Sequence, residues 1–146
     1  MIDEFKDNFE FLSNFYISPL QWDGYSWLTV EHIYQAVKTF DLAERQSIRR
    51  ASTCKEAKYL GYKVLLRPDW EKVKFNIMYE LIRLKFFPGT DLAKKLLATG
   101  QEILIEGNYW HDNTWGNCYC KKCKDIEGGN NLGFILMLVR KELKDV

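Results

Sequence analysis

The sequence lacks three features that would each assign it to a class of proteins. It contains no run of about 18 apolar residues, the length needed to cross a bilayer as a helix. Its start shows neither the basic region nor the apolar stretch of a secretory signal peptide. Its formal net charge is only +1, which is too weak to drive binding to DNA or to a membrane surface through bulk charge. These absences predict a cytoplasmic protein with no membrane partner.

The chain also lacks internal repeats and low-complexity linkers, so nothing divides its 146 residues into obvious parts. Apolar residues make up 47% and charged residues 28%, a composition that excludes wholesale disorder. At roughly 100–200 residues per domain, a single domain over residues 1–146 is expected. Without a secretory signal, the four cysteines are expected to be free thiols.

Helical patterns dominate the sequence. Thr29 is placed to cap a helix that begins at Val30, and Thr53 opens a capping box whose helix stops at Gly61. Further helices are predicted over residues 42–51, from an Asp69 cap to an end at Pro88-Gly89, from about residue 90 to Gly100, and after Asn130-Asn131.

Strands are predicted to be few and short. Asp23-Gly24 is typical of a two-residue turn and indicates a small hairpin between residues 20–22 and 25–27. Residues 62–66 and 102–106 are predicted to form two more strands. The expected fold is therefore a mainly α-helical α+β domain, single and compact, with a few short strands.

Residues 107–131 form a stretch without periodicity, longer than the loops of most compact domains. It carries Tyr109, Trp110, Trp115 and Tyr119, more aromatic residues than a solvated linker would hold. We therefore expect an ordered loop with a function.

The first predicted helix carries three polar residues on one face. Glu31, Gln35 and Lys38 are spaced i, i+4, i+7, so they would present a carboxylate, an amide and an amine in a row. If that face lines a cleft, these groups can work on a substrate. The alternative is an ordinary solvated face with weak contacts.

Asp112 supplies a second candidate carboxylate, beside Trp115 in the long loop. A pair formed by Glu31 and Asp112 would suit glycoside cleavage, in which one group protonates or orients the leaving group and the other stabilises a positive sugar centre or a water. The alternative is that Asp112 only caps a turn.

The loop also contains the pattern C-x-C-x-x-C at Cys118, Cys120 and Cys123. Three thiolates at this spacing could bind zinc, with His111 or Cys54 as the fourth ligand. A second well-spaced pair of ligands is missing, so free thiols remain the alternative and no cofactor is predicted. The glycine-rich segment before Asn131 leads into a helix start, a place that attracts anions.

Several strings, taken in order, resemble the NADAR family, which is also called YbiA-like. They are Phe11-Leu12-Ser13-Asn14-Phe15-Tyr16, Val30-Glu31-His32-Ile33-Tyr34-Gln35-Ala36-Val37-Lys38, Leu66-Arg67-Pro68-Asp69-Trp70, Leu97-Ala98-Thr99-Gly100, Asp112 with Trp115-Gly116, and Asn131-Leu132-Gly133-Phe134-Ile135-Leu136-Met137 with Arg140. The resemblance extends from about residue 5 to residue 143. Where many members carry a short Gly/Asp-rich loop, this chain has its cysteine cluster.

The resemblance implies an enzyme that hydrolyses N-glycosidic bonds to ribose. Two substrate classes are associated with the family: phosphorylated ribosylamino-pyrimidine intermediates of riboflavin biosynthesis, and ADP-ribose on guanine bases of nucleic acid. The family's functional glutamate, helix lysine, tryptophan and late aspartate match Glu31, Lys38, Trp70 and Asp112.

In the mechanism that we expect, Glu31 and Asp112 act on the ribosyl centre, and Lys38 either contacts a phosphate or attacks C1 as an amine. The expected substrate contacts come from Trp70, Trp115, Asn14, Gln35 and Asn131. The rival interpretation is a module that binds ADP-ribose or a nucleotide without cleaving it. Another is a zinc-stabilised interaction domain. The sequence does not indicate an oligomeric state.

Overall fold

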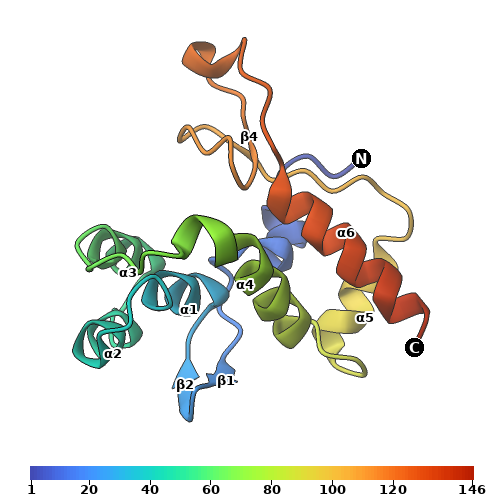
Figure 1. The fold of residues 1–146 in the computed structure, drawn as a ribbon. Coiled ribbons are helices and arrows are strands. Elements are labelled where there is room, and N and C mark those ends of the chain that lie inside the picture. Colours follow the sequence, from blue (N-terminus) through green and yellow to red (C-terminus); the bar gives the residue numbers. More distant parts are fainter. The chain divides into compact units, whose positions relative to one another are not determined.

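The computed structural model describes residues 1–146, which form two compact units (Figure 1). The first is the Asn14–Lys85 unit. The second, called here the terminal unit, combines Met1–Ser13 with Phe86–Val146. The expectation of a single domain stays a prediction.

The Asn14–Lys85 unit begins with the predicted hairpin. Strands β1 (Leu20–Trp22) and β2 (Tyr25–Trp27) pair antiparallel. Asp23 and Gly24 at the turn have φ angles of 51° and 79°, both in the left-handed region. Asp and Gly tolerate this conformation better than other residues, which is why the pair specifies a tight hairpin.

Four helices follow: α1 (Val30–Ala36), α2 (Leu42–Arg49), α3 (Cys54–Gly61) and α4 (Trp70–Lys85). The side chain of Thr29 accepts a hydrogen bond from the backbone N–H of His32, and Thr53 accepts one from Glu56, so both predicted caps are confirmed. Helix α1 packs against α2, α3 and α4, and Figure 1 shows α2 and α3 beside it.

The strand predicted over residues 62–66 is wrong, because these residues form no ladder with another segment. The backbone N–H of Leu65 instead donates to the Glu44 carboxylate on α2, with N···O distances of 3.3 and 3.4 Å. The Glu44 side chain thus supplies the hydrogen-bond acceptor that a neighbouring strand would have provided.

The terminal unit contains the 3-10 helix η1 (Asp7–Leu12) and helices α5 (Asp91–Ala98) and α6 (Asn131–Lys144). Helices α5 and α6 pack together. The Arg140 guanidinium on α6 fixes the end of α5, because it donates to the Thr99 hydroxyl and to the Glu102 carbonyl, each at 2.8 Å.

The strand predicted over residues 102–106 is also wrong. Only one isolated parallel bridge forms there, between Ile2 and Leu104. The Asn130 side chain takes the place of a second strand, since it donates to the Leu104 carbonyl at 2.9 Å and accepts from the Glu106 N–H at 2.9 Å. The observed strands come later, where β3 (Gly107–Asn108) pairs parallel with β4 (Asn117–Cys118).

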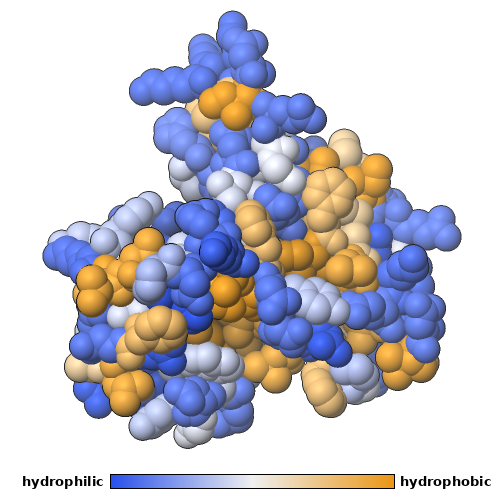
Figure 2. Space-filling view, in the orientation of Figure 1, coloured by the Kyte–Doolittle hydropathy of each residue, from blue (hydrophilic) through white to orange (hydrophobic).

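A second 3-10 helix, η2 (Lys121–Cys123), follows β4. The segment between α5 and α6 is therefore ordered by short elements, as expected for residues 107–131. Figure 2 shows that the tip of this segment is mostly hydrophilic around a small apolar group. The mainly helical α+β class is confirmed, and no helix combines the length and the apolar character needed to span a membrane.

Lys85, at the end of α4, is the one lysine in the chain that is buried. Its residue is 3% exposed, and its ammonium lies 5.6 Å from the centre of the Tyr16 ring. Burial lowers the pKa of Lys85 to about 7, against a weaker opposing effect of Cys54. Folding therefore favours the neutral amine.

This burial predicts a pH-dependent stability. Between about pH 7 and pH 8.5 the unfolded chain holds a proton on Lys85 that the folded chain has released, so the free energy of unfolding rises with pH, by up to about 1.4 kcal/mol per unit. The Lys85→Met variant should be more stable than the parent at pH 7 and should lose this rise. Urea unfolding at several pH values measures it, with the exposed Lys94→Met variant as control. Equal slopes in the parent and Lys85→Met would contradict the assignment.

Candidate active site

Helix α1 has no solvent-exposed side, because all seven of its residues are buried. Its polar residues include Glu31, 7% exposed, and Gln35, 3% exposed. The Gln35 side-chain amide donates to the Glu31 carboxylate at 2.7 Å. The prediction of a shared face is therefore confirmed for Glu31 and Gln35, and the alternative of a solvated face is wrong for both. Lys38, predicted on the same helix, lies beyond its end.

Helix α3 approaches this pair closely at Gly61. A Cβ atom at that position would lie 2.0 Å from the Gln35 side-chain oxygen, so only glycine fits there without displacing the amide. Gly61, the last residue of α3, thus allows the close contact between α3 and α1.

Lys38 lies two residues beyond the end of α1. Its ammonium is 5.5 Å from the centre of the Tyr34 ring, 5.8 Å from that of Tyr62 and 6.0 Å from that of Trp70. Burial lowers the pKa of Lys38, while the negative charge of Glu31 acts in the opposite direction. The amine therefore sits in an aromatic cage and releases its proton more readily than an exposed lysine.

Trp70 is placed by the turn that precedes α4. The Arg67 backbone N–H donates to the Lys38 carbonyl at 2.7 Å, which ties the turn to the end of α1. The Arg67 guanidinium contacts both Asp69 oxygens, at 2.6 and 3.0 Å. The Trp70 ring then packs on Tyr34 with a centroid distance of 5.2 Å. The Arg-Pro-Asp-Trp string thus closes one side of the lysine cage.

Asn14 lies next to the start of α1, where its backbone carbonyl accepts a hydrogen bond from the Glu31 N–H at 3.2 Å. Its side-chain N–H contacts the Met78 sulfur at 3.4 Å. Two buried oxygens in this region, Asn14 Oδ1 and Gln35 Oε1, have no hydrogen-bond partner. Because a buried unpaired polar atom costs about 1–3 kcal/mol, these oxygens mark where donors of a bound molecule or a water would fit.

His32, also on α1, has a structural role. Its Nδ1 lies 2.7 Å from the Thr29 hydroxyl, and its Nε2 lies 3.0 Å from the Ala51 carbonyl. Burial lowers its pKa, so the neutral ring is favoured. With both ring nitrogens engaged, His32 links α1 to the segment before α3.

Sequence reasoning missed three residues of this region. Tyr34 and Tyr62 complete the cage around Lys38, but Tyr34 had the spacing of a core residue and Tyr62 lay in a wrongly predicted strand. Lys85 had no signal, because a lysine in the last turn of a helix is usually a solvated partner of the helix dipole.

In the terminal unit, Asp112 belongs to a tight turn. Its Oδ1 accepts hydrogen bonds from the Thr114 N–H at 3.1 Å and the Trp115 N–H at 2.8 Å. The fully buried Asn108 holds the same turn, because its side chain donates to the Asp112 carbonyl and accepts from the Asp112 N–H. One oxygen of the Asp112 carboxylate thus caps this turn, which is the alternative role that the sequence left open for Asp112.

The start of α6 packs onto the same turn. The Asn131 side-chain amide donates to the Thr114 carbonyl at 2.6 Å, and the Leu132 N–H donates to the Trp115 carbonyl at 3.0 Å. The sequence predicts that the N–H groups at this helix start attract an anion. In the structure these two N–H groups donate to carbonyl groups of the protein instead. Asp112, Trp115 and Asn131 therefore lie together.

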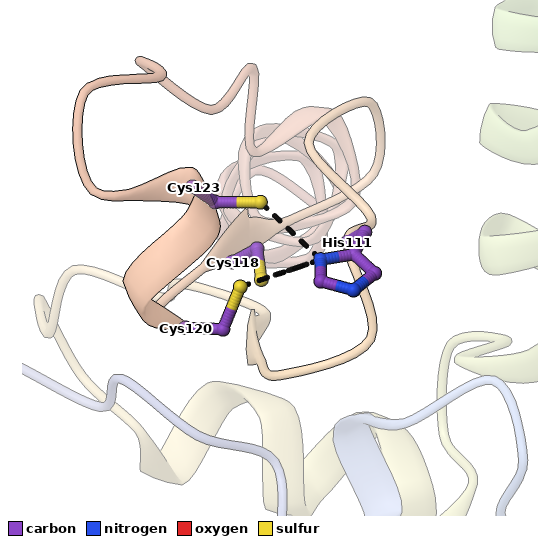
Figure 3. A group of neighbouring side chains, drawn as sticks. All are labelled: His111, Cys118, Cys120 and Cys123. Atoms are coloured by element: carbon purple, nitrogen blue, oxygen red, sulfur yellow. Dashed lines mark hydrogen bonds between the residues drawn. The ribbon is translucent and has the colours of Figure 1, made fainter.

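The same unit contains the one His/Cys group that could hold a metal ion, formed by His111, Cys118, Cys120 and Cys123 (Figure 3). The four candidate ligand atoms all lie within 4.8 Å of one another. All three cysteines are free thiols.

The predicted site residues thus form two sets. Asn14, Glu31, Gln35, Lys38 and Trp70 meet in the Asn14–Lys85 unit, and Asp112, Trp115 and Asn131 meet in the terminal unit. The convergence of both sets on one ribose stays a prediction.

Comparisons with known proteins agree with the resemblance. The N-glycosidase YbiA of Escherichia coli is 36% identical over 144 residues, which cover 94% of this chain and 84% of that protein. The N-glycosidase Npun_R5314 of Nostoc punctiforme is 42% identical over 125 residues, covering 82% of this chain and 76% of that protein. The riboflavin biosynthesis protein VVA0006 of Vibrio vulnificus is 37% identical over 95% of this chain, which spans only 37% of that longer protein.

The fold is shared as well. The NMR structure of the E. coli protein YbiA matches with a TM-score of 0.83 and 34% identity, over 99% of this chain and 88% of that one. The model of the NADAR domain matches residues 2–144, a range that takes in both units. The chain belongs to the NADAR domain family.

Proposed function

We propose that this protein is an N-glycosidase that hydrolyses an N-glycosidic bond to ribose in a small molecule. Its family membership and the N-glycosidase relatives support this chemistry. The observation that carries the proposal is the arrangement around α1, where the buried Glu31 carboxylate, held by Gln35, lies close enough to the caged Lys38 amine to shift its pKa.

The reaction consumes one water. The bond between C1 of the ribose and the nitrogen of the base or amine breaks, the nitrogen leaves with a proton, and C1 receives a hydroxyl group. Positive charge develops on the ribose as the bond lengthens, and the departing nitrogen gains electron density. A catalyst must therefore stabilise a cationic sugar and supply a proton to the leaving group.

We assign to Glu31 the stabilisation of the cationic sugar. Its carboxylate is withdrawn from solvent, so its field at C1 is screened less than that of a surface carboxylate. The hydrogen bond from Gln35 fixes its orientation before the substrate arrives. It can also hold the proton that the leaving nitrogen requires.

Lys38 is the proposed nucleophile. Burial lowers its pKa, which increases the fraction of neutral amine able to attack C1. The attack forms a C1–Nζ bond while the bond to the base breaks. A proton then passes from Nζ to the ring oxygen as the ring opens, which gives a protonated Schiff base. Water adds to C1 and gives up a proton to the Glu31 carboxylate, and Nζ departs as the free amine while the sugar keeps the oxygen of the water. The pyrimidine or purine leaves in the first of these steps.

The remaining residues are assigned to binding. Trp70 forms one wall of the lysine cage and can stack on the base. The unpaired oxygens of Asn14 and Gln35 suit donors such as ribose hydroxyls. We further propose that Asp112, through its second carboxylate oxygen, acts on ribose hydroxyls or as the acid–base partner, with Trp115 and Asn131 beside it.

We propose a phosphorylated ribosylamino-pyrimidine as the substrate. Relatives named for riboflavin biosynthesis, from Vibrio vulnificus and from Zea mays, support this class. Four free cysteines suit a reducing compartment, and we propose the cytoplasm. The reaction requires only side chains of this chain and water, so no catalytic cofactor is part of the proposal.

Incubation with substrate tests the function. The purified protein should release free base from a phosphorylated ribosylamino-pyrimidine, detected by mass spectrometry. A parallel incubation with an ADP-ribosylated guanine oligonucleotide tests the nucleic-acid substrate. Calorimetric binding of either compound without release of base would instead identify a binding module and contradict the proposal.

Replacement of Glu31 by glutamine should lower turnover by about 10²–10⁴-fold, because the amide cannot stabilise the positive charge or carry the proton. The fold should be kept, since the glutamine has the same shape. Initial rates of base release measure the effect. The Glu80→Gln variant, which alters an exposed pair with Arg83 on α4, is the control and should keep full activity. Unchanged turnover in Glu31→Gln would remove the assigned role.

Sodium borohydride should trap a protein–sugar adduct during turnover, because it reduces the Schiff base on Lys38 to a stable amine. Intact-protein mass spectrometry should show the added mass of the phosphorylated sugar in the parent and none in Lys38→Met. The exposed Lys72→Met variant should be labelled like the parent. Label that persists in Lys38→Met would place the nucleophile elsewhere.

A further inference from the structure

We propose that His111, Cys118, Cys120 and Cys123 bind one zinc ion, and that this ion holds the segment of residues 107–131 in its folded form. The relationship to N-glycosidases does not require such a site. The proposal depends on the geometry of four side chains within the terminal unit (Figure 3).

The distances fit a tetrahedral zinc site. With Zn–S bonds of about 2.3 Å and a Zn–N bond of about 2.0–2.1 Å, a tetrahedron places the nitrogen about 3.6 Å from each sulfur. The His111 Nδ1 lies 3.3 Å from the sulfur of Cys120, 3.4 Å from that of Cys123 and 3.9 Å from that of Cys118. The three N···S distances are therefore close to those expected when one zinc ion binds the nitrogen and all three sulfurs.

The backbone around the cluster is shaped to present these atoms. The Cys123 N–H donates to the Cys120 carbonyl at 3.1 Å in the turn of η2, which brings both thiols to one side. The Cys118 N–H donates to the Asn113 side chain at 3.0 Å. His111 has a φ angle of 70°, a left-handed conformation that is uncommon for residues other than glycine. Coordination of its ring supplies a reason for that conformation.

The segment has little apolar packing of its own. Four of its large apolar side chains are between 41% and 58% exposed, namely Tyr109, Trp110, Tyr119 and Ile126. Cys118 and Cys123, by contrast, are each 5% exposed. Thiols therefore occupy the interior of the segment of residues 107–131, where a larger domain would have a hydrophobic core. Small structural units of this kind are commonly held together by a metal ion.

The donor set selects the metal. Three soft thiolates with one imidazole in a tetrahedral arrangement favour zinc over magnesium or calcium, which prefer oxygen ligands. Four protein ligands fill the coordination sphere, so the site is structural and does not activate a water. The sequence left Cys54 open as the fourth ligand, but its thiol contacts the Thr29 hydroxyl at 3.3 Å in the Asn14–Lys85 unit, and His111 takes the position.

The site would position part of the proposed active site. Asp112 follows His111 directly in the chain, and its turn is bonded to Asn108 on β3. An ion that fixes His111 relative to β4 and η2 therefore limits the motion of the Asp112 turn. This consequence depends on the proposed function, whereas the metal site itself does not.

Metal analysis of the full-length protein tests the site directly. Protein purified under reducing conditions should contain about one zinc per chain. The metal-free protein should take up Co²⁺ and develop the visible absorption of tetrahedral cobalt together with thiolate-to-cobalt charge transfer. A zinc content below about 0.1 per chain, with no tetrahedral cobalt spectrum, would overturn the proposal.

Variants test the ligands. Cys120→Ser and Cys123→Ser should each lose zinc, while Cys54→Ser should keep it. Far-UV circular dichroism monitors the α-helices, none of which contains a residue of the cluster. Zinc retained at the parental level in the double variant of Cys120 and Cys123 would show that the metal binds elsewhere.

Limited proteolysis gives a readout that needs no variant. Lys121, Lys122 and Lys124 are exposed cleavage sites for trypsin within the segment. Zinc binds only the folded form of the segment and so stabilises it against opening. Removal of zinc by a chelator should therefore speed cleavage at these lysines by about tenfold or more. Addition of zinc should restore protection. Equal rates with and without chelator would contradict the stabilising role.

Because none of these readouts involves base release, failure of the metal site and failure of the N-glycosidase proposal can be told apart.

Discussion

The burial of α1 on every side is the constraint on which the Asn14–Lys85 unit depends. A helix that is enclosed by its neighbours normally carries only apolar residues, yet this one contains a carboxylate, an imidazole and an amide. Each of these groups must find a partner inside the protein. Gln35 bonds to Glu31 within the helix, and His32 bonds to the cap residue Thr29 and to Ala51, which ties α1 to the segment between α2 and α3. Glu31 and Gln35 of the candidate site are therefore part of the core.

Much of the helical structure could be predicted, because the information that starts and ends a helix is local. Thr29, Thr53 and Thr90 each lie next to the N–H groups that they cap, and Gly100 adopts the positive φ of a helix end. Strands depend on partners that are distant in the sequence. The segments around Leu65 and Leu104 have strand-like composition, but side chains of Glu44 and Asn130 satisfy their backbones.

The candidate site was only partly visible in the sequence. The i, i+4 spacing predicted the contact between Glu31 and Gln35, since it lies within one helix. The cage around Lys38 requires Tyr62 and Trp70 from two other segments, which no spacing rule relates to α1. The cysteine pattern suggested three ligands for the proposed zinc ion and left His111 and Cys54 open as the fourth; the structure places His111 beside the three thiols, with a left-handed backbone conformation that the sequence does not specify.

Gly61 places a limit on how this site can change during evolution or design. Any larger residue there would push the Gln35 amide away from α3, and the amide in turn orients the Glu31 carboxylate. A substitution on one helix would thus alter the direction of an acidic group on another without touching it. Attempts to broaden the range of accepted sugars should therefore leave this glycine in place and vary the aromatic rings instead.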